Sequence, residues 1–245
     1  MKKMKLLAVV AAVVAAASQS ASALTFTDAG TTAPVGSYIS NPQVSPGSGA
    51  TYTYFDSNNT GGVGQSFTAT TSTWISTVTI KGAAYFTSPT NPVFPQADFT
   101  LKLGTLTGST YGALGSETVT VPAGTIHTNP GLNYTHYFTF TLAAPVPVTA
   151  GNTYVFDFLT TTANNATDYF VFNGSPAGVS PYAGGNSLAL NSNTSPTFVA
   201  STGSNDVTFF LGSAPVPEPS QWALVPVLGT IAFLAFRRFR SQSVA

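Results

Sequence analysis

The sequence predicts an all-β protein: an antiparallel two-sheet β-sandwich, jelly-roll-like, with an N-terminal signal helix and a C-terminal hydrophobic helix. Three observations lead to this fold class. Between Leu24 and Ser213, apolar residues recur at every second position in many short runs, turn-forming residues separate the runs, and no run sustains the 3.6-residue period of a helix. A Greek-key barrel is the alternative, and a β-solenoid is disfavoured because no fixed repeat is present.

Five runs show the clearest alternation of apolar and polar residues. The sets expected to share the core-facing side of these strands are Phe99, Leu101 and Leu103; Trp74, Val78 and Ile80; Tyr134, His136, Phe138, Phe140 and Leu142; Tyr154, Phe156 and Phe158; and Val207, Phe209 and Leu211. Further strands are expected at 52–55, 65–69, 118–121, 169–172, 187–190 and 197–200.

Turn-forming residues lie between these runs, as in 107–109 (Thr-Gly-Ser), 150–152 (Ala-Gly-Asn) and 173–175 (Asn-Gly-Ser). Two longer stretches, 31–49 and 87–96, are rich in proline and are expected to be loops. In a sandwich, such loops gather at the ends of the sheets, where binding sites are common.

The charge pattern excludes several classes of function. Charged residues make up 7% of the chain, against about 25% in typical soluble domains. Between Leu24 and Ser213 only two lysines, Lys81 and Lys102, stand against seven carboxylates. This acidic balance argues against nucleic-acid binding. The chain has no cysteine, which excludes disulfides, thiolate nucleophiles and cysteine-ligated metals.

The N-terminus has the pattern of a secretory signal peptide over residues 1–23. Three lysines among the first five residues precede an apolar run at 6–17, and Ala21-Ser22-Ala23 forms an A-x-A cleavage site. A membrane anchor is the alternative, but the run is shorter than the roughly 20 residues that span a bilayer. We expect general secretion and cleavage after Ala23.

The C-terminus contains three further elements over residues 214–245. A proline-rich motif, Val216, Pro217, Glu218, Pro219 and Ser220, precedes an apolar span at 222–236, and a basic cluster of Arg237, Arg238 and Arg240 follows. The arginines are expected to stay cytoplasmic as a stop signal. The span would extend about 22 Å as a helix, short of the roughly 30 Å hydrocarbon core.

This ordered set of elements resembles the PEP-CTERM sorting domain. The resemblance implies membrane insertion of the precursor, recognition and cleavage by an exosortase, and a Gram-negative producer of exopolysaccharide in whose envelope or extracellular matrix the protein resides. Trp222, Pro226 and the extension at 241–245 depart from the family pattern. A permanent single-pass anchor is the alternative interpretation.

Catalytic patterns are absent from the sequence. No Gly-x-Ser-x-Gly, HExxH or P-loop motif occurs, and only His127 and His136 are available as histidines. His136 shares the parity of Phe138 and is expected in the core, hydrogen-bonded. The carboxylates, including Asp157, are expected to be solvated or to cap turns. We therefore expect no enzyme activity, no resident metal and no cofactor; calcium at Asp168, near Asn164 and Asn165, is left open.

Carbohydrate binding is the second hypothesis for function. Four aromatic residues in or near loops are candidate glycan contacts: Tyr85, Phe94, Tyr111 and Tyr182. Packing at the rim of the sandwich is the alternative role for each. Segments 65–69, 138–142 and 150–156 loosely resemble galactose-binding-type jelly-roll modules of bacterial surfaces. The leading hypothesis is a non-enzymatic envelope or matrix protein associated with exopolysaccharide and biofilm; a secreted glycoside hydrolase is the least favoured.

Overall fold

Thirteen β-strands make up the regular structure of the described residues. The computed structural model describes residues 23–42, 53–55, 63–86, 96–108, 110–126, 136–160, 168–174, 182–190, 198–200 and 206–214. The strands are β1 (Thr25–Asp28), β2 (Ile39–Asn41), β3 (Thr53–Phe55), β4 (Val63–Thr68), β5 (Thr73–Phe86), β6 (Ala97–Thr107), β7 (Thr110–Val121), β8 (His136–Val148), β9 (Thr153–Thr160), β10 (Asp168–Phe172), β11 (Ser187–Leu190), β12 (Phe198–Ala200) and β13 (Phe209–Ala214). The predicted all-β class and its antiparallel two-sheet arrangement are confirmed.

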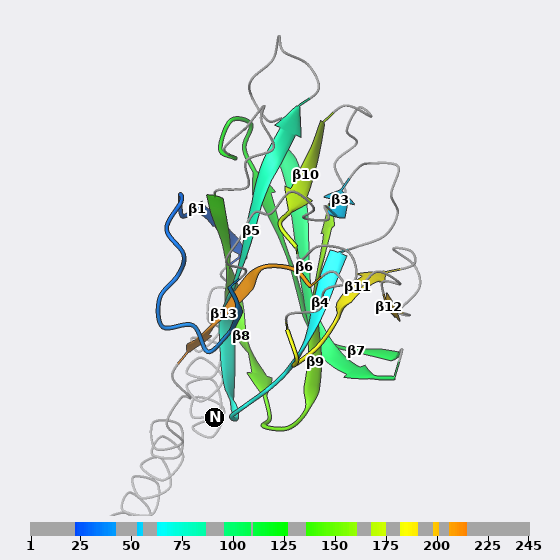
Figure 1. Cartoon of the computed structure of the whole chain (residues 1–245). Coiled ribbons are helices and arrows are strands. Elements are labelled where there is room, and N and C mark those ends of the chain that lie inside the picture. The colour runs from blue at the N-terminus through cyan, green and yellow to red at the C-terminus, as the bar shows by residue number, and fades with distance from the viewer. Residues whose placement is uncertain are drawn as a thin grey trace, which may run out of the picture. The chain divides into compact units, whose positions relative to one another are not determined.

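The strands form two antiparallel sheets (Figure 1). One has seven strands in the order β1-β8-β5-β10-β3, with β13 pairing both β5 and β2. The other has six strands in the order β12-β11-β4-β9-β6-β7. Strands that follow one another from β3 to β6 alternate between the two sheets, so most of the pairing joins residues far apart in sequence.

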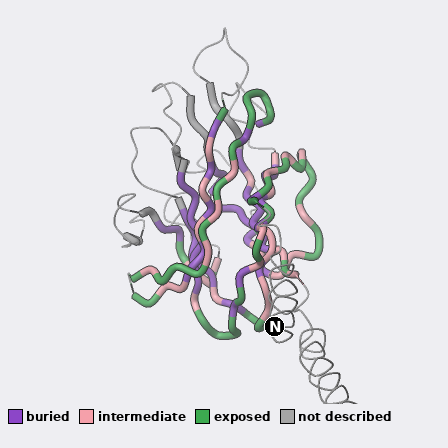
Figure 2. Tube along the Cα trace, turned by 180° about the vertical axis from the view of Figure 1, so that it is seen from behind, coloured by how far each residue is buried: buried purple, intermediate pink, exposed green. Residues whose placement is uncertain are grey.

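The core lies between the two sheets, and phenylalanine is its most frequent residue. Phe140 on β8 and Phe158 on β9 pack across the sandwich with ring centroids 4.7 Å apart. Phe156 and Phe209 make a second cross-sheet contact at 5.2 Å. All four rings are 0% exposed, and burying each stabilises the fold by roughly 1.5–3 kcal/mol. Figure 2 shows the buried segments running through the middle of the sandwich and exposed turns at its ends.

One predicted core face is wrong at its first residue. Ile75 is fully buried, whereas Trp74, expected beside Val78 and Ile80, is only partly buried. The register between β5 and β8 shifts between Ile75 and Thr77. Between the pairs Ile75–Val146 and Thr77–Thr141, β5 advances by two residues and β8 by five, so the pairing is irregular here. The alternation along β5 changes at this point, and Ile75 rather than Trp74 lies on the core side.

Two short strands were not expected. β1 pairs with β8, and β2 lies inside the predicted loop 31–49, where it pairs with β13. β2 is only three residues long, too short for a period-2 pattern to be recognised. Two predicted turns are confirmed by glycines with positive φ: Gly108, φ 62°, between β6 and β7, and Gly151, φ 83°, between β8 and β9.

The terminal segments lie outside the described residues. These include the signal sequence up to residue 22, with Ala21 of its cleavage site, and the sorting motif, apolar span and basic cluster at 216–240. Within the part of the chain that the structure describes, no helix is long and apolar enough to cross a membrane.

Candidate functional site

The candidate site lies on the outward face of the six-stranded sheet. Gln65 and Phe67 of β4 are fully buried toward the interior, so the alternating Ser66 and Thr68 point to the opposite face. Register pairs Thr68 with Thr153 on β9. Hydroxyl-bearing side chains from two paired strands therefore lie together on this face.

A glycine-rich segment, 182–186, docks along β4 and forms one wall of the site. The Asn186 carbonyl accepts hydrogen bonds from the Ser66 backbone N–H at 2.9 Å and from its hydroxyl at 3.1 Å. The Thr68 hydroxyl donates to the Gly184 carbonyl at 3.0 Å. A Cβ on Gly185 would lie 1.9 Å from the Ser66 carbonyl oxygen, so this close approach requires glycine.

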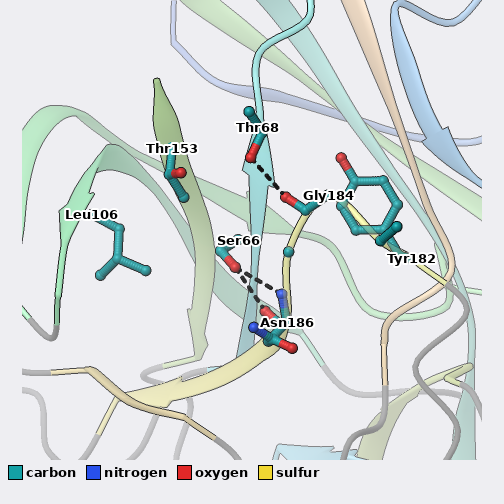
Figure 3. Close-up of a pocket in the computed structure, with 9 residues that line it drawn as sticks. Ser66, Thr68, Leu106, Thr153, Tyr182, Gly184 and Asn186 are labelled. Atoms are coloured by element: carbon teal, nitrogen blue, oxygen red, sulfur yellow. Dashed lines mark hydrogen bonds between the residues drawn. The ribbon is translucent and has the colours of Figure 1, made fainter. Parts of the chain in front are cut away.

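Between this segment and β9 lies an open groove of about 410 Å³. Figure 3 shows Leu106 and Thr153 on one side, Gly184 and Asn186 on the other, and Ser66 and Thr68 between them. The described residues that line the groove carry no charge; they are Ser66, Thr68, Leu106, Thr153, Tyr182, Ala183, Gly184, Gly185 and Asn186.

Two polar side chains of the groove are available to a ligand. The Thr153 hydroxyl and the Asn186 carboxamide make no side-chain hydrogen bond with any other described residue, and Asn186 is exposed. An amide supplies donors and an acceptor, and a hydroxyl supplies both roles. With the apolar Leu106 opposite, these groups fit a neutral ligand that carries hydroxyl groups.

Tyr182, one of the predicted glycan contacts, lines the groove and is half-buried. Its ring packs edge-on against Phe209 with centroids 5.1 Å apart. Burial raises the pKa of its phenol, and the nearby Asp206 acts in the same direction. The ring is thus held by the core, as the rim-packing alternative expects, while its segment forms the wall of the groove.

A buried carboxylate anchors the groove wall from beneath. Asp206 is 1% exposed, contrary to the expectation that it is solvated or caps a turn. Its Oδ2 accepts a hydrogen bond from the Tyr182 backbone N–H at 3.0 Å, and its Oδ1 accepts one from Gln65 Nε2 at 2.9 Å. These hydrogen bonds offset the cost of burying the carboxylate. Because the partners lie far from Asp206 in sequence, the local sequence does not reveal them.

Asp157 contradicts the same expectation. It is 0% exposed on β9, on the side opposite the main core. The reason is a second apolar cluster on the outward face, in which Val155, Leu159 and Leu188 are buried. Burial raises the pKa of Asp157 to about 8, while the nearby Lys102 acts in the opposite direction.

Of the remaining predicted glycan contacts, only Tyr111 has a described side chain, and it is not among the residues that line the groove. Tyr111 packs against the outward apolar cluster, and its hydroxyl donates to the Leu103 carbonyl at 2.9 Å. Tyr85 lies on β5, where its backbone pairs with Tyr169, and its side chain lies outside what the structure describes. Phe94 also lies outside the described residues, as does His127.

Other predicted polar residues have structural partners. Asp28 Oδ1 accepts from the Gly30 backbone N–H at 2.9 Å, as expected for a turn cap, and lies 2.8 Å from His136 Nδ1. His136 is therefore hydrogen-bonded as predicted, although its side chain is 17% exposed rather than fully buried. Glu117 accepts from the backbone N–H groups of Ala143 and Ala144 at 2.8 and 3.1 Å.

The groove residues Ser66, Thr68, Thr153 and Asn186 were not singled out in the sequence. The one local signal was the Gly184-Gly185 pair beside Tyr182, because paired glycines mark close backbone approach. Among the described residues, no three histidine or carboxylate side chains gather as metal ligands. No protein-family model matches the chain, and no curated protein matches it.

Proposed function

We propose that this chain is the precursor of an exported, non-enzymatic protein of the cell envelope or extracellular matrix. The general secretion machinery exports it, its C-terminal tail inserts transiently in the membrane, and an exosortase cleaves the PEP-CTERM-like tail. The mature protein then associates with exopolysaccharide in a biofilm. The basis is the signal-peptide pattern at 1–23 and the ordered motif, span and basic cluster at 216–240.

The observation that carries the proposal is where the strands begin and end relative to the two predicted cuts. Ala23 is exposed, while Leu24 is 2% exposed and β1 starts at Thr25. At the other end, β13 finishes at Ala214, two residues before the sorting motif. Removing both ends would therefore leave every strand of the two described sheets in place.

The engagement of the carboxylates supports a role other than hydrolysis. Glycoside hydrolysis needs two acids about 5–10 Å apart across a cleft. Asp28 and Glu117 instead accept hydrogen bonds from backbone N–H groups, and Asp206 holds Gln65 and the groove wall. None of the described residues that line the groove is an acid.

The strand order favours the jelly-roll form of the sandwich, which is part of the same proposal. Strands β3 to β10 follow the order β3-β10-β5-β8 in one sheet and β4-β9-β6-β7 in the other. Eight strands distributed over two sheets in this interleaved way support the jelly-roll form of the sandwich.

Sorting is tested in the producing bacterium with two tail variants. Replacing Pro217, Glu218 and Pro219 by alanine should leave a precursor that keeps its tail and stays in the membrane fraction. The matched control replaces Ser241, Gln242 and Ser243 by alanine, beyond the basic cluster, and should be processed like the wild type. Normal processing of the motif variant would contradict the proposal.

A second candidate function, binding of a neutral glycan, is favoured by the groove. Its free Thr153 hydroxyl and Asn186 amide, its volume of about 410 Å³ and its uncharged lining suit a sugar unit. Asn186→Ala and Thr153→Val should each weaken binding of the host exopolysaccharide about fivefold, the equivalent of roughly 1 kcal/mol.

The matched control for this second candidate is Thr118→Val. Thr118 is exposed on β7 of the same sheet, where its hydroxyl hydrogen-bonds Thr100 at 2.8 Å. This substitution should leave glycan affinity unchanged. Two results would exclude the groove as the site: lack of binding to any neutral glycan on an array, or an affinity equal to that of the wild type in all three variants.

A further inference from the structure

Asp157 lies in the middle of β9, and no described residue forms a hydrogen bond or a close ion pair with its carboxylate. Its neighbours in register are Lys102 on β6 and Gly64 on β4. Its side chain is fully buried, and neither carboxyl oxygen has a hydrogen-bond partner in the described structure. A buried ionised carboxylate without such partners is strongly destabilised relative to its protonated form.

The surroundings of Asp157 are apolar and closed by the β6–β7 hairpin. Val155, Leu159 and Leu188 form the buried cluster, and Leu106 and Tyr111 pack against it. These last two residues pair in register near the tip of the hairpin. Access of water to this cluster therefore depends on the hairpin staying in place.

Tyr111 is held down by two features of β6. Its hydroxyl donates a hydrogen bond to the Leu103 carbonyl at 2.9 Å. Its ring occupies the space over Gly104, where a Cβ would lie 2.1 Å from Tyr111 Cε2. The pairing of β6 with β9 reaches Thr105. Beyond it, the Tyr111 side chain connects the hairpin tip to the sheet, and its release would uncover the cluster.

The ionisable groups facing Asp157 are few. β6 supplies Lys102, which is partly buried, and β7 supplies the Tyr111 phenol. β4 presents Gly64, and the described residues of β11 carry no charge. No ion pair joins Lys102 to Asp157 within 4.0 Å among the described residues, so the lysine does not neutralise the carboxylate directly.

We propose that Asp157 is a proton-dependent latch: when protonated it allows the β6–β7 hairpin tip to close over the outward face, and its ionisation releases the tip. An open hairpin exposes the carboxyl to water, where it regains ordinary acidity. The closed form therefore binds the proton more tightly than the open form does, which makes closure favourable at low pH.

The pH range over which the hairpin tip opens follows from the direction in which burial shifts the pKa of Asp157. Burial raises the pKa of Asp157 from its ordinary value of 3.8 to about 8. Closure is fully stabilised below about pH 4, weakens as the pH rises, and loses this contribution above about pH 8. Burial, followed by the nearby Asp157, raises the pKa of Tyr111 to about 12, so the phenol stays neutral throughout this window.

Leu106 connects the latch to the groove, because it packs on the apolar cluster and also lines the groove wall. Opening of the tip would move that wall. An effect on glycan affinity rests on the second candidate function, so the test of the latch uses a measurement that requires no glycan.

The test is amide hydrogen exchange on the full-length chain in mild detergent from pH 5 to 9, corrected for intrinsic exchange rates. Protection at 104–113 should fall about a hundredfold or more over this range, while β5 and β8 stay protected. In Asp157→Asn, which keeps the side-chain shape, protection should not change with pH. Asp98→Asn, which removes a carboxylate from β6 rather than from β9, should behave as the wild type does.

Carbon-13 NMR of the aspartate carboxyl groups provides a second measurement, which is independent of how well the variants fold. The signal that is missing in Asp157→Asn should titrate in the wild type with a midpoint near pH 8. A midpoint near pH 4 overturns the latch. So does equal pH dependence in Asp157→Asn, or loss of protection spread evenly over β5 and β8.

Discussion

Gln65 and Asp206, 141 residues apart in the chain, meet in the buried interior, where Gln65 Nε2 donates a hydrogen bond to Asp206 Oδ1 at 2.9 Å. Gln65 Oε1 in turn accepts from the Val207 backbone N–H at 2.9 Å. Asp206 Oδ2 accepts from the Tyr182 backbone N–H at 3.0 Å. These two side chains therefore tie together β4, the groove wall and the segment that enters β13.

Asp206→Ala should lower the free energy of unfolding by about 3 kcal/mol. The substitution removes the acceptor of the Tyr182 N–H and leaves Gln65 Nε2 only the longer bond to the Ser66 carbonyl at 3.3 Å. Buried donors that lose their acceptors cost about 1–3 kcal/mol each. Urea unfolding followed by tryptophan fluorescence measures the change. Asp206→Asn keeps one carbonyl acceptor and should cost less. A loss below about 0.5 kcal/mol in Asp206→Ala would show that the network contributes little.

Gly185→Ala should destabilise the protein by about 1–3 kcal/mol, because the new Cβ overlaps the backbone carbonyl of Ser66. Gly184→Ala is the matched comparison. Its Cβ would meet the Tyr182 hydroxyl at 2.6 Å and the ring carbon Cζ at 2.7 Å, which are side-chain atoms and can shift more readily than the Ser66 backbone. The midpoint of thermal unfolding should therefore be lower for Gly185→Ala than for Gly184→Ala. The reverse order would contradict the docking of this segment on β4.

Phe140→Ala should cost about 3–5 kcal/mol, because the ring is fully buried and contacts Phe99 and Phe158. Val35→Ala is the control: Val35 is 95% exposed and should change stability by less than about 0.5 kcal/mol. Chemical denaturation at one pH compares the two. Similar midpoints for both variants would place the core elsewhere.

Glu117→Gln tests the link between β7 and β8. The carboxylate accepts from the backbone N–H groups of Ala143 and Ala144, and the neutral amide should hold them less well, at a cost of about 1 kcal/mol. Hydrogen exchange at residues 143 and 144 should accelerate while exchange in β9 is unchanged. Unaltered exchange at these two amides would contradict the link between Glu117 and β8.

Much of the fold could be predicted because its strands alternate cleanly. Tyr154, Phe156 and Phe158 were expected to share a core face, and all three are buried. The irregular pairing at Ile75–Thr77 reversed the expected face of Trp74, since a register shift between two strands leaves no mark in the local pattern of one strand. β2 was missed because its stability comes from pairing with β13 rather than from its own three residues.

The candidate site was less predictable. Its polar residues come from β4, β9 and the 182–186 segment, and only sheet topology brings them together. Asp157 shows the same limit: alternation placed it opposite the core, but did not show that a second apolar cluster covers that face. Of the two aromatic candidates whose side chains the structure describes, Tyr111 and Tyr182, only Tyr182 lines the groove, beside the glycine pair that permits close docking.

The intact mass of the protein recovered from the envelope and culture of its producer tests the central claim most directly. Processing at both ends predicts a chain that begins at Leu24 and lacks the apolar span 222–236 and the basic cluster beyond it. Any additional mass would report glycan attachment. A recovered protein whose mass still includes residues 222–245 would contradict cleavage of the tail, and one that retains residues 1–23 would contradict the signal peptide.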